Sequence, residues 1–84
     1  MNEEDKKYLL QKDQHDLLTD FKNFEDRKKL YESMYEMMEK FNFISTQERI
    51  ILSDLGRLIS FFESKMDIVK LKLRDIEIML LVLN

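Results

Sequence analysis

Residues 46–83 decide the fold, and they read TQERIILSDLGRLISFFESKMDIVKLKLRDIEIMLLVL. Apolar residues recur through this stretch at alternating spacings of three and four, without a missed position. A repeat of this kind is typical of a helix that packs along one side against another helix. The members of the repeat are Leu52, Leu55, Ile59, Phe62, Met66, Val69, Leu73, Ile76, Leu80 and Leu83.

The start of this helix is marked by a capping box, Ser45-Thr46-Gln47-Glu48. In such a box the serine side chain accepts a hydrogen bond from the backbone of the first turn, and the glutamate reaches back toward the cap. We therefore predict a helix over about residues 46–83. Gly56 lies inside it at a cost of about 1 kcal/mol relative to alanine, and close approach of a neighbouring backbone is one reason for a glycine there.

Residues 3–41 carry a looser heptad pattern and predict a second long helix. Three acidic residues stand at its start, where the helix dipole favours negative charge. A turn is expected over about residues 42–45, and a break near Thr19–Asn23 is left open. The apolar positions are Leu10, Leu17, Phe24, Tyr31 and Met38, supported by Phe21, Met34 and Phe41.

Folding the chain back at this turn brings the two heptad patterns into register. The predicted pairs are Tyr31 with Leu55, Phe24 with Phe62, Leu17 with Val69, and Leu10 with Ile76. The two arms are also matched in length. The sequence thus predicts an all-α chain of one domain, residues 1–84, folded as an antiparallel helical hairpin.

A second apolar stripe runs along the far side of the 46–83 helix. Its members are Phe61, Ile68, Leu71, Ile78 and Val82. A helix that is apolar on two faces is expected to be buried on two faces. We therefore expect two hairpins to pair through this helix as a homodimer, in a four-helix bundle or a coiled-coil-like assembly. The alternative is a monomer in which the first helix breaks and covers both faces.

The residues expected to drive self-association come from both stripes of the 46–83 helix. They are Leu52, Leu55, Ile59, Phe62, Met66, Val69, Leu73, Ile76, Leu80, Phe61, Ile68, Leu71 and Ile78. The apolar, methionine-rich segment 30–41 is the candidate surface for a second protein, because methionine and tyrosine are favoured at surfaces that accept partners. The candidate partner-binding residues are Tyr31, Met34, Tyr35 and Met38, although ordinary bundle core is the favoured interpretation of the segment.

Composition excludes several classes of protein. Hydrophobic residues make up 44% and charged residues 37%, which is too apolar for a disordered chain. The net charge of −3 disfavours nucleic-acid binding. The basic residues Lys65, Lys70, Lys72 and Arg74 are also interleaved with Asp67, Asp75 and Glu77. The absence of cysteine excludes a disulfide scaffold and fits a reducing, cytoplasmic compartment. The apolar end, residues 76–83, is far shorter than the roughly 20 residues that span a bilayer.

The lack of alanine, with lysine in excess over arginine, indicates a low-GC genome such as that of a firmicute or its phage.

No combination of residues predicts catalysis, a cofactor or a metal ion. His15 has no nucleophile at a meaningful spacing, and the acidic triplets at helical spacing lack the histidines of a bundle metal site. Those triplets are Glu32, Glu36 and Glu39, and Asp13, Asp16 and Asp20. A weak candidate anion site lies at the helix start, formed by Ser45, Thr46 and Arg49. Simple helix capping is the favoured interpretation of those three residues.

The expected function is therefore that of a small non-enzymatic interaction protein. It would act as a regulator, inhibitor or adaptor of another protein, through self-association and an exposed apolar helical face. A structural or assembly subunit is the first alternative. A bundle that binds a phosphate ligand at Ser45–Arg49 is the second.

Overall fold

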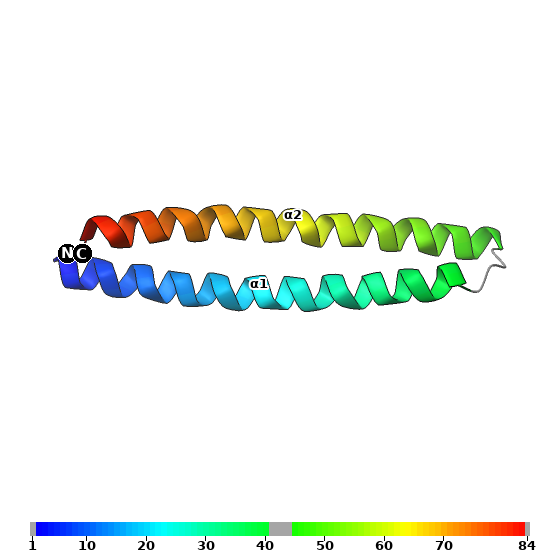
Figure 1. Cartoon of the computed structure of the whole chain (residues 1–84), viewed down its shortest axis with the longest axis horizontal. Coiled ribbons are helices and arrows are strands. Elements are labelled where there is room, and N and C mark those ends of the chain that lie inside the picture. The colour runs from blue at the N-terminus through cyan, green and yellow to red at the C-terminus, as the bar shows by residue number, and fades with distance from the viewer. Residues whose placement is uncertain (1, 41–44, 84) are drawn as a thin grey trace.

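The computed structural model describes residues 2–40 and 45–83, and these form two long antiparallel helices (Figure 1). Helix α1 spans Glu3–Lys40 and helix α2 spans Thr46–Leu83, with 38 residues in each. The hairpin is a thin rod of 62 × 16 × 14 Å. Across the described residues the regular structure is helical only, as the heptad patterns predict. Phe41 and most of the predicted turn, residues 42–44, lie outside the described part of the chain.

Both helices begin at a side chain that caps the first turn. The Ser45 hydroxyl accepts a hydrogen bond from the Glu48 backbone N–H at 3.2 Å and donates one to the Glu48 carboxylate, also at 3.2 Å. The predicted capping box is thus confirmed. At the start of α1 the Asn2 side-chain oxygen accepts a hydrogen bond from the Asp5 N–H at 2.8 Å. This second cap satisfies an N–H group that the helix itself leaves without a partner.

Helix α1 is continuous through residues 19–23, where a break had been left open. The Thr19 hydroxyl donates to the His15 carbonyl at 3.1 Å, so this polar side chain is satisfied inside the helix. The alternative fold, in which the first helix breaks to cover both faces of α2, is therefore not the one adopted.

The two helices meet along the heptad seam of α2. The side chains that are fully buried recur every seven residues: Leu55, Phe62, Val69 and Ile76. The other members of the repeat are half-buried, and so are Leu10, Leu17, Phe24, Tyr31 and Met38 on α1. No side chain of α1 is fully buried. The hairpin therefore has a narrow core, and the side chains that are fully buried in it all belong to α2.

Phe62 shows how the helices interlock. Its ring centroid lies 6.0 Å from that of Phe24 and 5.7 Å from that of Tyr31. The predicted Phe24–Phe62 contact is therefore confirmed, but Phe62 sits between two α1 residues one heptad apart. A knob that enters a hole on the facing helix has this geometry. Lys28, midway between Phe24 and Tyr31, is only 25% exposed, because its stem lies along the seam while its amine pairs with Glu32.

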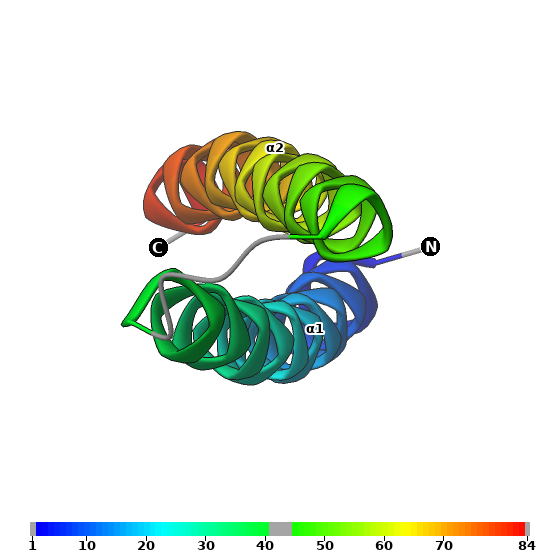
Figure 2. The same cartoon turned by 90° about the vertical axis from the view of Figure 1, so that its right-hand side faces the viewer.

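Figure 2, viewed along the rod, shows the two helices side by side with no further layer on either side of the pair. Each helix therefore turns most of its circumference to solvent. For α1 that circumference is largely charged, whereas α2 carries ten exposed large hydrophobic side chains among its charged ones, and this difference sets up the candidate site.

Candidate interaction surface

The side of α2 that faces away from α1 is apolar and exposed. Phe61 and Ile68 come one residue before buried Phe62 and Val69, which places them about 100° around the helix from the seam. Leu71 and Ile78 come two residues after Val69 and Ile76, about 200° around. We call the surface formed by the following residues the outer face of α2: Ile50, Phe61, Ile68, Leu71, Ile78 and Val82, all of them exposed.

The accessible surface of the hairpin is larger than a protein of its size normally shows. It measures 6772 Å² for a 10.3 kDa chain, whereas a globular monomer of that mass exposes about 5,400 Å². Among the described residues sixteen large hydrophobic side chains are exposed, and ten of these belong to α2. The excess of roughly 1,400 Å² exceeds the 800 Å² or so that each partner buries in a stable interface.

An open apolar groove continues the outer face onto α1 at the end of the rod where the two termini lie (Figure 1). Leu9 and Leu10 line it from α1, and Ile78, Met79 and Val82 line it from α2. Its volume is about 490 Å³. The groove exists because the apolar C-terminal half of α2 lies against the most polar part of α1, which has few large side chains to cover it.

A second groove lies next to the first along the rod, and we call it the polar groove because charged side chains stand at its rim. Asp13 and Asp16 of α1 and Lys72 and Asp75 of α2 line it, over a floor that includes Leu17, and its volume is about 400 Å³. Three carboxylates thus share this groove with one ammonium group. Within the described residues, no group of three or more acidic or histidine side chains lies close enough together to hold a metal ion.

The residues predicted to drive self-association fall into two sets. Those of the heptad repeat lie in the seam against α1, where four of them are fully buried. Phe61, Ile68, Leu71 and Ile78 lie on the outer face and are exposed. Only this second set is accessible to another chain while the hairpin is intact.

The candidate partner-binding residues are also divided by the fold. Tyr31, Tyr35 and Met38 are half-buried in the seam, with the Tyr31 ring stacked on Phe62 at an interplanar angle of 16°. Met34 is exposed. Leu30 and Met37 are exposed with it, four residues before and three after, so the three share one side of α1. Sequence reasoning missed these last two, although each directly precedes a seam residue.

The candidate anion site is occupied by its own cap. The Ser45 hydroxyl is bonded to Glu48, whose carboxylate supplies the negative charge that a helix start favours. Arg49 is exposed, and Arg57 lies 3.8 Å from Asp54. This geometry accounts for Ser45 and Glu48 as a helix cap.

Cations on α2 lie over aromatic rings. The Lys65 amine is 5.3 Å from the centroid of Phe61, and the Lys70 amine is 5.7 Å from that of Phe21 on α1. The two lysines point to different sides of α2, so the basic stretch of the sequence is dispersed in space. His15 is exposed and 3.8 Å from Asp16.

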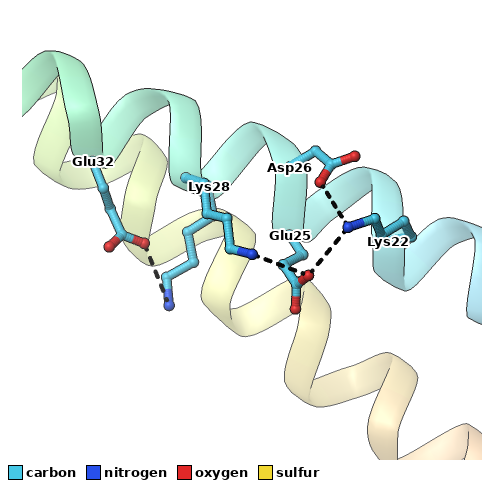
Figure 3. Close-up of polar contacts among 6 residues, drawn as sticks. Lys22, Glu25, Asp26, Lys28 and Glu32 are labelled. Atoms are coloured by element: carbon cyan, nitrogen blue, oxygen red, sulfur yellow. Dashed lines mark hydrogen bonds and ion pairs between the residues drawn. The ribbon is translucent and has the colours of Figure 1, made fainter.

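The surface of α1 carries intrahelical ion pairs, which Figure 3 shows for residues 22–32. Lys22 lies 3.2 Å from Asp26 and 3.7 Å from Glu25, and Glu25 also pairs with Lys29 at 3.5 Å. The hydrogen bond to Asp26, together with the negative charges of Asp26 and Glu25, raises the pKa of Lys22 above its ordinary value. Such exposed pairs are weak because solvent screens them, so they favour the helix without defining a site.

Neither helix contains a stretch long and apolar enough to cross a membrane. The most distinctive feature of the described residues is the apolar surface of α2 and its continuation onto α1. No protein-family model matches the chain, and it matches neither a curated protein nor a solved structure.

Proposed function

We propose that this chain is a non-enzymatic helical interaction protein, which self-associates through the outer face of α2 and acts as a regulator, inhibitor or adaptor of another protein. The exposed outer face is the observation that carries the proposal. A monomer would leave these six hydrophobic side chains in water, and large exposed apolar patches on monomeric proteins are uncommon.

A role beyond assembly is favoured by a second apolar surface. Leu30, Met34 and Met37 lie near the turn end of α1, and α1 is not the helix that carries the outer face. Methionine adapts its shape to different partners. After two hairpins pair through α2, these residues remain available to another protein.

The proposal is tested by the mass of the protein in solution, measured by light scattering across a dilution series with a thermal melt at each concentration. We expect twice the 10.3 kDa chain mass and a melting temperature that rises with concentration, because association stabilises the folded chain by mass action. A monomer at every concentration, with one melting temperature throughout, would contradict self-association.

A matched pair of variants locates the surface. Leu71 on the outer face is 62% exposed and Leu18 on α1 is 53% exposed, so glutamate at either position meets a similar environment in the single hairpin. We expect Leu71→Glu to shift the mass toward the monomer and Leu18→Glu to leave it unchanged. Met37→Glu should also leave the mass unchanged, which separates the α1 surface from self-association.

A further inference from the structure

We propose that the occupant of the outer face is a second copy of α2 lying antiparallel to the first, with the two-fold axis level with Met66. This arrangement rests on the proposed function, because it assigns a geometry to the self-association already inferred. In it, residues at equal distances before and after Met66 face one another across the axis.

Four of the six apolar residues of the outer face meet one another in this arrangement. Phe61 and Leu71 are each five residues from Met66, and Ile50 and Val82 are each sixteen residues from it. Each of these four residues is exposed in the single hairpin and would face a hydrophobic residue of the second copy. Each pair also occurs twice, because the axis is a two-fold.

The charges beside the apolar stripe also match. Arg57 and Asp75 are each nine residues from Met66, and Lys65 and Asp67 flank it directly. Arg57 of the second copy would bring a guanidinium group to the polar groove, where Asp75 shares the space with two carboxylates of α1 and a single lysine. The Arg57 side chain is 81% exposed and free to reorient from its 3.8 Å contact with Asp54.

The neighbouring registers place the charges less well. Moving the axis half a heptad toward the C-terminus still pairs Phe61 with Ile78 and Ile68 with Leu71, but it sets Lys65 against Arg74 and Arg57 against Val82. Moving the axis half a heptad toward the N-terminus places Arg57 against Ile68 and Asp75 against Ile50. Both charged side chains would then be buried in the interface without an oppositely charged partner. Parallel, in-register pairing sets Arg57 against itself, and like charges in contact disfavour association.

Two positions in the favoured register are imperfect, because Ile78 faces Asp54 and Ile68 faces Ser64. The Asp54 side chain is 60% exposed in the single hairpin. The surface available is sufficient, because the roughly 1,400 Å² by which the hairpin exceeds a globular monomer is in the range that each subunit of an obligate dimer buries.

Charge reversal tests this register. In the Arg57→Asp homodimer an aspartate at 57 faces Asp75, and in the Asp75→Arg homodimer Arg57 faces an arginine. We expect each variant alone to raise the dimer Kd on the order of tenfold or more, since two like-charged contacts form per dimer. An equal mixture of the two variants restores both opposite-charge contacts in the heterodimer, so its Kd should return to near the wild-type value.

The control is Glu63→Lys. Glu63 is exposed and follows buried Phe62, so it lies on the flank of α2 turned away from the outer face. We expect it to leave the Kd unchanged, although it alters the net charge as much as Asp75→Arg does. Circular dichroism of every variant at the same concentration verifies that the helices are intact.

The outcomes separate the two proposals. A wild-type protein that is monomeric throughout overturns the proposed self-association itself. A wild-type dimer that is indifferent to both reversals, or whose two variants fail to recover on mixing, overturns only the register centred on Met66. Weakening by each variant alone with recovery in the mixture supports the antiparallel arrangement.

Discussion

Phe61 and Phe62 are adjacent in the sequence but lie in different environments. Phe62 is 8% exposed and Phe61 is 51% exposed, and their rings meet edge to face at 5.3 Å. Phe62 fills the seam between the helices, whereas Phe61 lies at the boundary between the seam and the outer face. The two residues therefore report on folding and on association separately.

Replacing each phenylalanine by alanine separates these roles. We expect Phe62→Ala to lower the free energy of unfolding by about 3–5 kcal/mol, as for other buried aromatic residues. Phe61→Ala is expected to weaken dimerisation. The difference in stability between this variant and wild type should become smaller on dilution, because the wild-type dimer then dissociates as well. Urea denaturation at several protein concentrations measures both effects. Equal, concentration-independent losses for the two variants would contradict this division.

Gly56 is a position at which stability can be gained. A Cβ atom added there would have no neighbour within 4 Å, so a close backbone approach within the hairpin does not explain this glycine. We expect Gly56→Ala to stabilise the protein by about 1 kcal/mol through helix propensity, which raises the melting temperature by about 4–8 °C for a chain of this size. Gly56 lies off the outer face, so the dimer Kd should not change. A fall in melting temperature would indicate that another chain packs against this residue.

The ion pairs around Lys22 predict a local effect of pH. Because folding raises the pKa of Lys22, the contribution of its charged form is present below the ordinary lysine pKa and is lost as the pH rises through the raised value. Asp26→Asn removes the leading cause, so the Lys22 pKa should fall back toward its ordinary value in an NMR titration. The remote change Asp67→Asn should leave it where it is in wild type.

At the scale of the helices, the start of α2 depends on one hydroxyl group. Ser45→Ala removes both hydrogen bonds to Glu48 and should cost about 1 kcal/mol of stability, the usual loss for an N-cap replaced by alanine. Ser45→Asp keeps an acceptor at the cap and should retain most of that stability. Thermal melts of the two variants at matched concentration measure the difference. Equal melting temperatures for Ser45→Ala and wild type would show that the cap contributes nothing.

The helices could be predicted from the sequence because the information for them is local. The apolar repeat of α2 has no missed position, and the four consecutive residues 45–48 form the sequence pattern of a capping box. The offset between the helices is not local. The register predicted from the sequence sets Phe24 directly opposite Phe62. In the structure Phe62 packs between Phe24 and Tyr31, so the two helices are offset by about half a heptad from that register.

The candidate partner-binding surface was harder to predict than the fold. Apolar residues of segment 30–41 cover most of the helix circumference, so the pattern does not show which of them face α2. Tyr31 and Tyr35 turn inward, and Leu30 and Met37 remain outside with Met34. The exposed stripe of α2 was predictable, because its spacing places it opposite a seam that is itself unambiguous.

At the scale of the whole molecule, length and thinness determine behaviour. A rod 62 Å long and 14–16 Å thick exposes both sides of each helix, so within the described residues four fully buried side chains and their half-buried neighbours in the seam hold the two helices together. Small domains with so narrow a core are marginal on their own. We infer that folding and association are coupled in this protein, so its melting temperature is expected to depend on protein concentration.

Both ends of the described chain lie at the same end of the rod, and this decides how two copies can be joined by genetic fusion. In the antiparallel dimer, the termini of one hairpin lie at the turn end of the other. A tether from Leu83 of the first copy to Asn2 of the second must then span nearly the 62 Å length of the rod, which needs about 18 extended residues or more. A tandem protein with a 30-residue flexible tether should therefore close on itself as a single-chain bundle, and one with a five-residue tether should form larger species. If the short tether closes equally well, the two hairpins lie with their turns at the same end.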